Sequence, residues 1–453
     1  MAFHVSFSLT FPSNLDVFYI RDSERGLHAH RATLAKDLHD GFIPRMSDQR
    51  IAILGGGILG VCTALELAQR GRRVTLIEGA ADLLQGASRW NEGKIHLGFL
   101  YAADPTLSTA TRLIPGGLAF ATLVERLVGQ SIDEFATTDD DVFLVHRDSV
   151  VDANSFASYA TRTAELIRVA ASQDGAHPYL TDVKRARAHA LSPSELSCLT
   201  ESEDVVAGFA VPERSVSTVP IADLLCRAVR TEPCVEVHEN TWISGVQRRD
   251  DGRWDVLTSS SGATDHRAFD VVVNALWEGR LAVDATAGVV PSAPWSHRFR
   301  AGVFGQAADS ALRSAVLCTG PFGDVKRYAD GRVYLSWYEA GLVAEGNALE
   351  PPRAAAVLTP DRLAAVERET LGALSRYFPP VVQLREHATQ LQVRGGWVYA
   401  IGQGSLADRA STLHQRDKFN MTIDDGYISV DTAKYSLAPW LANRVARMID
   451  RGV

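Results

Sequence analysis

Cysteine is scarce in this chain, and the spacing of the few cysteines excludes two kinds of site. Only five stand among the 453 residues, and no two form a Cys-x-x-Cys pair that could hold zinc or make a redox disulfide. An odd, scattered set of thiols is typical of a reducing compartment, so we expect the cytoplasm. The consecutive acids at 139–141 are interpreted as a solvated turn, and no metal site is predicted.

Long apolar runs and an excess of positive charge are also absent. No segment approaches the roughly 18 apolar residues of a membrane-spanning helix, and the first residues lack the basic start and apolar core of a signal peptide. The net charge of −8 argues against nucleic-acid binding, which needs dense positive charge. With 46% hydrophobic and 22% charged residues, the composition is that of a globular protein with a small-molecule partner. The sequence leaves the oligomeric state open.

Residues 1–48 differ from the rest: 7–20 have a few strand-like positions, but 21–45 are polar and carry no complete apolar face. We interpret them as a poorly packed extension, and Met46 as a candidate start of the native chain. A short helix docked on the surface is the alternative.

The strongest pattern is RIAILGGGILGVCTALELAQRGRRVTLIEG, residues 50–79. It predicts a buried strand, a glycine turn, a helix and a second strand. Its glycines follow Gly55-x-Gly57-x-x-Gly60, which lets a pyrophosphate approach the helix N-terminus. Glu78, at the end of the second strand, is placed to accept hydrogen bonds from ribose hydroxyls. These features predict a dinucleotide site, with a tight turn in an unrelated α/β protein as the alternative.

Later segments indicate that this dinucleotide fold is interrupted. FDVVVNALWEG (269–279) predicts a buried parallel strand, whereas 102–214 are largely helical and 296–340 alternate as strands, with a hairpin around Asp330-Gly331. We therefore predict an α/β fold in two interleaved parts. A Rossmann-like, FAD-type domain takes 49–101, 215–290 and 391–453, because an NAD dehydrogenase would usually continue as regular strand and helix units. An α+β substrate domain with a mostly antiparallel sheet takes 102–214 and 291–390.

One histidine stands out in GASRWNEGKIHLGFLYAADP, residues 86–105. His96 lies between Gly93 and Gly98, in a segment too polar and too rich in glycine for an ordinary core element. Read alone, the stretch leaves two possibilities open: a structural histidine bonded to nearby backbone, or one that faces a reacting group.

Taken in order, these residues resemble the FAD-dependent oxidoreductases of the D-amino acid oxidase (DAO) superfamily, over about residues 50–449. The 50–79 unit is similar to the family's FAD adenosine and pyrophosphate site, and GYISVDTAKYSLAPWLA (426–442) resembles its closing segment. The His96 stretch is nearest to the L-2-hydroxyglutarate dehydrogenase branch, which carries an Asn-x-Gly-x-Ile-His-x-Gly pattern that ends in a tyrosine, here Tyr101. The resemblance implies that the FAD-binding domain is of the glutathione reductase type, and that His96 lies over or beside the isoalloxazine ring.

Two positions depart from the family pattern. Leu276 and Trp277 stand where a glycine usually follows VVNAA, and Ala433 replaces the glycine before Lys434. Both departures leave the substrate open.

The resemblance also implies a set of site residues. An arginine commonly clamps the substrate carboxylate, because its planar fork matches that group; the candidates are Arg89, Arg327, Arg394 and Arg416. We predict His96, Arg327 and Tyr338 as catalytic. The cofactor-binding residues expected are Gly55, Gly57, Ile58, Leu59, Gly60, Glu78, Gly79, Arg89, Asn91, Gly93, Lys94, Ile95, Trp277, Gly402, Lys434 and Tyr435.

The function implied is oxidation of a C–H bond next to an amine or hydroxyl, by hydride transfer to FAD. With an alcohol substrate His96 would act as the base, and with an amine it would orient the substrate. A third possibility is covalent attachment of the flavin through His96. The alternatives are a flavin monooxygenase, a pathway-specific tailoring oxidase of secondary metabolism, and a non-catalytic FAD- or NAD-binding protein.

Overall fold

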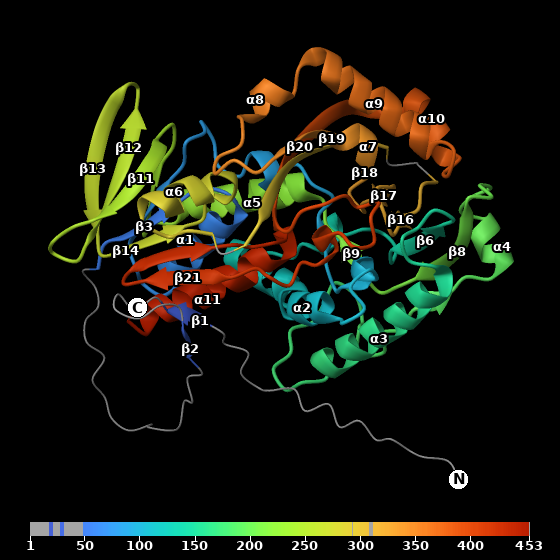
Figure 1. The fold of residues 1–453 in the computed structure, drawn as a ribbon, viewed down its shortest axis with the longest axis horizontal. Coiled ribbons are helices and arrows are strands. Elements are labelled where there is room, and N and C mark those ends of the chain that lie inside the picture. Colours follow the sequence, from blue (N-terminus) through green and yellow to red (C-terminus); the bar gives the residue numbers. More distant parts are fainter. Residues whose placement is uncertain (1–17, 21–27, 31–48, 292, 308–310, 453) are drawn as a thin grey trace, which may run out of the picture.

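The computed structural model describes residues 18–20, 28–30, 49–291, 293–307 and 311–452 (Figure 1). Most of the predicted extension, residues 1–48, therefore lies outside the described residues. The two short segments that are described form strands β1 (Phe18–Ile20) and β2 (His28–His30), and β1 pairs in parallel with β21 (Met421–Asp424).

The predicted dinucleotide fold is built on one sheet, which we call the cofactor sheet. Its parallel strands run in the order β10, β4, β3, β14 and β22, and β21 continues it antiparallel to β22. The chain builds it from distant pieces, namely β3 (Ile51–Leu54), β4 (Val74–Ile77), β10 (Val235–His238), β14 (Val271–Asn274) and β22 (Tyr427–Val430).

Alternate residues of β3 pack on opposite faces of the cofactor sheet, as the period of a strand requires. Ile51 and Ile53 join the core that includes helices α1 (Ile58–Ala68), α5 (Thr218–Thr231) and α11 (Ala438–Asp450). Ala52 and Leu54 join a second core with a three-stranded meander and α6. The bounds of these last elements are β11 Trp242–Arg248, β12 Trp254–Ser260, β13 Ala263–Phe269 and α6 Arg280–Thr286.

A second, mostly antiparallel sheet forms the predicted substrate lobe, and we call it the substrate sheet. Its order is β19, β15, β18, β17, β16, β6, β8 and β7, with β20 on the other side of β15. The pair β6–β16 is parallel. The bounds are β6 Val142–His146, β7 His189–Ala190, β8 Val205–Ala210, β15 Trp295–Gln306, β16 Ala315–Cys318, β17 Gly323–Arg327, β18 Arg332–Trp337, β19 Leu342–Gly346 and β20 Thr389–Ile401.

Helices cover the substrate sheet. Figure 1 shows α9 and α10 lying over β19 and β20, while α2 and α3 lie on the other side of the molecule. Val366, Leu371 and Leu374 of α9 pack against Phe299 and Val333 in one core. The bounds are α2 Ser108–Val128, α3 Ala153–Ala171, α4 Pro193–Ser197, α7 Tyr338–Gly341, α8 Ala354–Val357, α9 Pro360–Leu374 and α10 Pro380–His387; the small pair β5 Lys94–Ile95 and β9 Arg214–Ser215 joins the two parts.

Two expectations about the chain's layout differ from the structure. We assigned 391–401 to the cofactor part, but β20 pairs along its length with β15 of the substrate sheet. We expected 102–214 to be largely helical, yet β6 and β8 from this region lie inside the substrate sheet. In both cases the local pattern of a buried strand is the same whichever sheet it joins, because long-range pairing decides its place.

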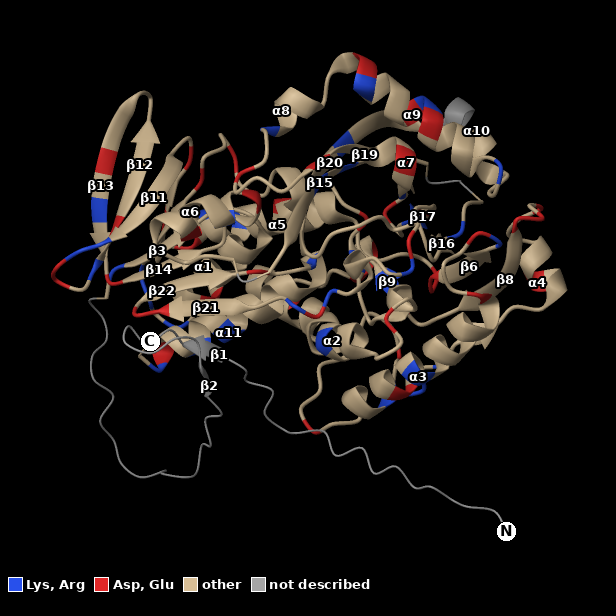
Figure 2. Ribbon diagram, in the orientation of Figure 1, with Lys and Arg blue, Asp and Glu red and all other residues tan. Residues whose placement is uncertain are grey.

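Charges of both signs are scattered over the outer elements (Figure 2), for example on α3, α9 and β13. Within the described residues, no helix is long and apolar enough to span a membrane.

Candidate active site

A cleft of about 680 Å³ runs along the carboxyl ends of the cofactor-sheet strands. Its walls come from the turn after β3, the end of β4, residues 85–96, the turn after β14, residues 350–354, β20 and the closing segment 430–435. Ligands of open α/β sheets bind at this edge, and the volume lies within the range of ligand pockets.

The N-terminus of α1 opens into the cleft at one end. Its N-cap, Gly57, supplies no side-chain bond, and the first turn carries no acid. Gly60 packs so closely on the turn that a Cβ atom there would stand 1.9 Å from the carbonyl oxygen of Gly55. The Ile58 amide donates to Ser88 Oγ at 2.9 Å. The positive end of the helix dipole and the glycine turn, which has no side chains in the way, suit a pyrophosphate.

Glu78 stands at the end of β4, as predicted, and lines the cleft. Its carboxylate accepts hydrogen bonds from the amides of Gly56 (2.6 Å) and Ala80 (2.7 Å). Glu278 lines the same end of the cleft, and burial, with help from Glu78 and Glu350, raises the pKa of Glu278 to about 7. Carboxylates here can accept hydrogen bonds from ribose hydroxyls.

The two departures from the family's glycines keep a glycine-like backbone. Trp277 has φ +57° and Ala433 has φ +50°, in the left-handed region that residues with a Cβ rarely adopt. Both line the cleft. The Trp277 indole also donates to the carbonyl oxygen of Trp397 at 2.7 Å, which ties this turn to β20.

His96 also lines the cleft and is 2% exposed. Its ring centroid is 5.6 Å from that of Tyr101, and its Nδ1 has no hydrogen-bond partner among the described residues. Burial, reinforced by Lys434 and Lys94, lowers the pKa of His96 well below its ordinary value. A neutral imidazole with an unpaired nitrogen can accept a proton or a hydrogen bond.

The glycines that flank His96 serve backbone packing. A Cβ atom on Gly93, at φ +60°, would stand 1.8 Å from the carbonyl oxygen of Val216, and one on Gly98 would stand 2.5 Å from the Cβ of Ala110. We expected Gly93 in the cofactor site, but it does not line the cleft. These glycines fix the His96 segment against its neighbours.

Positive charge gathers around His96 and Tyr101. Lys434 Nζ lies 5.5 Å from the Tyr101 ring centroid, and burial together with Arg416 lowers the pKa of Lys434 to about 7. Arg416 is 9% exposed, and its Nη1 has no partner among the described residues. Burial and then Arg298 lower the pKa of Arg416 to about 10. This concentration of buried cations favours an anionic ligand, because unpaired buried charge is costly.

Arg298 was missed in the sequence. It lies on β15, is 4% exposed, and donates to the Tyr338 hydroxyl at 3.1 Å, while its Nε is unpaired within the described part of the chain. Tyr338, a predicted catalytic residue, contacts Arg298, and both influence the pKa of Arg416. Tyr338 itself does not line the cleft. The sequence carried no signal for Arg298, since a single arginine on a strand looks like any surface arginine.

Asp141 was misinterpreted. The acids at 139–141 do not form a solvated turn, since Asp141 is fully buried and Asp140 accepts from Arg214 Nε at 2.7 Å. Asp141 binds two buried lysines, Lys94 at 2.5 Å and Lys326 at 2.7 Å. This ion pair could not be predicted from the local sequence, because the lysine partners of Asp141 lie far away along the chain.

The structure brings together most of the predicted cofactor residues and leaves out others. Arg89 binds Asp223 at 2.6 Å instead of facing the cleft, and the predicted catalytic Arg327 and the candidates Arg394 and Arg416 also lie outside its walls. The predicted residues that line the cleft are Gly55, Gly57, Ile58, Leu59, Glu78, Gly79, Asn91, Lys94, His96, Trp277, Lys434 and Tyr435; those that do not are Gly60, Arg89, Gly93, Ile95 and Gly402.

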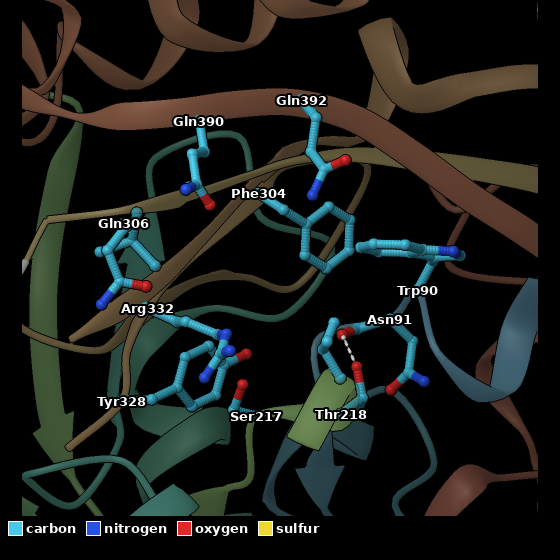
Figure 3. A pocket seen from close by; sticks show the side chains of 13 residues that line it. Trp90, Asn91, Ser217, Thr218, Phe304, Gln306, Tyr328, Arg332, Gln390 and Gln392 are labelled. Atoms are coloured by element: carbon cyan, nitrogen blue, oxygen red, sulfur yellow. Dashed lines mark hydrogen bonds between the residues drawn. The ribbon is translucent and has the colours of Figure 1, made fainter. Parts of the chain in front are cut away.

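A second, smaller cavity of about 140 Å³ lies beside the cleft (Figure 3). Asn91 lines both spaces. The figure shows Gln306, Gln390 and Gln392 around this cavity, with Trp90 and Phe304 edge to face at 5.2 Å between ring centroids. Its lining is rich in amides and includes one arginine, Arg332, which forms an ion pair with Asp330.

Comparison with known proteins gives a family. Residues 50–405 match the family described as FAD dependent oxidoreductase. Glycerol-3-phosphate dehydrogenase 1 of Mycobacterium tuberculosis (strain ATCC 25618 / H37Rv) is 42% identical over 62 residues, which is 14% of this chain and 12% of that protein. Because the match spans so little of the relative, it carries no activity over to this chain.

Solved structures share the fold over most of the chain. Iminodiacetate oxidase from Chelativorans sp. BNC1 has a TM-score of 0.61 at 17% identity and covers 88% of this chain and 94% of its own. Glycine oxidase from Geobacillus kaustophilus gives 0.59 at 17%, covering 89% and 95%. L-alpha-glycerophosphate oxidase from Mycoplasma pneumoniae, with FAD bound, gives 0.58 at 16%, covering 89% and 94%. At these identities the likeness concerns the fold alone.

Proposed function

Because this chain belongs to the DAO family of FAD-dependent oxidoreductases, we propose that it oxidises a C–H bond next to an amine or hydroxyl of a small anionic molecule. Its cofactor is FAD, which accepts the hydride when bound. The resemblance of the His96 stretch to the L-2-hydroxyglutarate dehydrogenase branch stays a prediction.

One observation carries the proposal: a single cleft joins a dinucleotide cradle to a buried neutral histidine. The open N-terminus of α1 and the Glu78 carboxylate fit the pyrophosphate and adenosine ribose. The flavin end would be held by Lys94, His96, Lys434 and Tyr435, which line the same cleft. The residues present therefore fit FAD.

The cations near His96 support an anionic substrate. Arg416 and Arg298 each keep an unpaired nitrogen within the described part of the chain, and the arginine fork matches a carboxylate or a phosphate. We retain Arg416 as the predicted ligand of the substrate carboxylate. The catalytic roles of Arg327 and Tyr338 stay predictions. Tyr338 would act through Arg298, which donates a hydrogen bond to its hydroxyl.

His96 is proposed as the proton acceptor for a hydroxyl substrate. The ring is neutral at pH 7, which is the state a base requires, and its lowered pKa makes it a weaker base than a free imidazole. With an amine substrate the same nitrogen would accept a hydrogen bond from the amine and orient it. Structural relatives named for glycine, iminodiacetate and glycerophosphate leave both chemistries in play. All five cysteines are free thiols, which supports the proposal of a reducing, cytoplasmic setting.

The first experiment is to purify the protein, record its visible spectrum, and follow anaerobic bleaching with amino acids, secondary amines, 2-hydroxy acids and glycerol phosphate. We expect a yellow protein bleached by an anion of one of these classes. A colourless protein that takes up no added FAD would contradict the proposal. Acid precipitation separates covalent from free flavin, because free flavin stays in the supernatant.

Arg416→Met tests anion binding. Losing one buried ligand to the substrate anion should raise the apparent dissociation constant for the bleaching substrate at least tenfold, about 1.4 kcal/mol, while FAD content stays normal. Arg409→Met, which removes an exposed arginine from the same loop, is the matched control. Equal affinity in Arg416→Met and wild type would remove Arg416 from the site.

A further inference from the structure

Four buried ionisable side chains form a cluster next to the His96 segment, and three of them lie outside the walls of the cleft. We call it the Asp141 cluster: Lys94, Asp141, Glu213 and Lys326, each 3% exposed or less. Groups of this kind are rarely fully buried unless they are paired, because each ion loses its hydration. The cluster therefore needs a reason beyond stability.

Asp141 stands at the centre of the cluster. One carboxylate oxygen binds Lys94 Nζ at 2.5 Å and the other binds Lys326 Nζ at 2.7 Å. Glu213 lies 3.9 Å from Lys94 on its other side. Burial alone would lower the pKa of Lys94, but Asp141 and Glu213 outweigh it and raise that pKa above its ordinary value. Lys94 is therefore a fixed positive charge.

The same cluster holds the backbone that carries His96. The second oxygen of Glu213 accepts from the Leu97 amide at 2.6 Å, directly after His96. Just before His96, β5 pairs with β9, and the Ile95 carbonyl accepts from the Tyr179 hydroxyl at 2.6 Å. Lys94 begins this strand and lines the cleft. The segment is thus fixed on both sides of the histidine.

The charges that face His96 come from four parts of the chain. Lys434 belongs to the closing segment, Lys94 to β5, Lys326 to β17 and Arg416 to the loop after β20, and each disfavours a proton on the ring. The two acids of the cluster face Lys94, and burial raises the pKa of Glu213, whose other oxygen accepts from the Leu97 amide. Lys94 is thus the cation of the cluster that lies on the His96 strand itself.

We propose that Lys94, held by Asp141 and Glu213, is a positioning residue that fixes the His96 segment and keeps the His96 ring neutral, as a hydrogen-bond acceptor for the substrate. The residue stands at an unspecified position of the Asn-x-Gly-x-Ile-His-x-Gly pattern, so it is a feature of this chain's own sequence. The role rests on the proposed function only where a substrate proton is concerned. The electrostatic effect on His96 is measurable without any substrate.

The test is an NMR titration of the FAD-bound protein carrying ¹³Cε1-labelled histidine, in which the His96 signal is the one that disappears in His96→Gln. In Lys94→Met we expect the His96 titration midpoint to rise by roughly 0.5–1 pH unit over wild type, because a nearby like charge is gone. Lys94→Arg, which keeps the charge, should stay near wild type. The pH limb of flavin reduction should move in the same direction.

Lys184→Met is the matched control, since Lys184 is exposed, and should leave the His96 midpoint unchanged. If Lys94→Met does not fold, Lys326→Met removes the second lysine of Asp141 and should raise the midpoint less. An unshifted midpoint in the folded lysine variant, or a shift of equal size in Lys184→Met, overturns the proposal. A shifted midpoint without bleaching by any substrate class would keep this inference and reject the proposed function.

Discussion

The role of His96 depends on the residues that surround it in the fold. Its sequence context left a structural role and a chemical role open, and the choice depends on neighbours that come from distant parts of the chain. Lys434 and Arg416 follow it by more than 300 positions, yet both act on its proton affinity. Asp141 shows the same dependence, because the acids beside it made a buried ion pair look like a solvated turn.

Replacing His96 by Gln should slow flavin reduction by about 10²-fold or more if the ring takes a proton, since general bases typically contribute 10²–10⁴-fold. Stopped-flow reduction with the bleaching substrate measures this effect. A rate equal to wild type would return His96 to a structural role.

The same variant has a pH signature in stability. The folded-state pKa of His96 is lowered, so its contribution to stability is complete above the unfolded value of about 6.5 and is lost as pH falls below it. We expect His96→Gln to lose less stability than wild type between pH 7 and pH 5, as measured by urea denaturation. An identical loss in both proteins would contradict the buried neutral ring.

At the scale of elements, local signals predicted what local forces decide. The unit from β3 to β4 and the hairpin between β17 and β18 form as expected, and the Thr359 side chain caps the start of α9. The cap and the Asp-Gly turn act through nearest neighbours. The sheet that β20 joins could not be predicted, because its partner β15 lies about 90 residues earlier in the chain. The local sequence of β20 is equally compatible with a strand of the cofactor sheet.

The turns at Trp277 and Ala433 offer a paired test of backbone strain. Ala433→Gly removes a Cβ from a left-handed residue and should stabilise the protein by about 0.5–1 kcal/mol, seen as a small rise in Tm. Trp277→Gly relieves the same kind of strain but deletes the bond to the Trp397 carbonyl and a wall of the cleft. It should release FAD more readily, as measured by fluorescence of free flavin. Tighter FAD binding in Trp277→Gly would contradict this assignment.

At the scale of the whole molecule, the cofactor cleft is the seam between two sheets. Its floor belongs to the cofactor sheet, while Trp397 and Val398 of β20 come from the substrate sheet. A ligand that fills the cleft contacts both parts, and it stabilises the folded state by mass action. Holding the parts together is therefore a second consequence of binding FAD.

Glu78→Ala tests this coupling. Loss of the carboxylate that accepts hydrogen bonds from the Gly56 and Ala80 amides should weaken FAD binding at least tenfold. It should also reduce the rise in Tm on adding FAD. Glu236→Ala, at an exposed position on β10, serves as the control. Calorimetric titration of the apoprotein gives the affinity, and an unchanged value would move the ribose site away from Glu78.

The glycine contacts around His96 carry a consequence for redesign. A Cβ atom on Gly93 would stand 1.8 Å from the carbonyl oxygen of Val216, and one on Gly117 of α2 would stand 2.3 Å from the carbonyl oxygen of His96 itself. Side chains added at these points have nowhere to go, so randomising the segment would mostly yield unfolded variants. Anyone who wishes to redirect the enzyme toward new substrates should leave residues 93–98 alone. Under the proposed function, diversity belongs at Arg298, Tyr338 and Arg416, where we expect changes to alter substrate recognition.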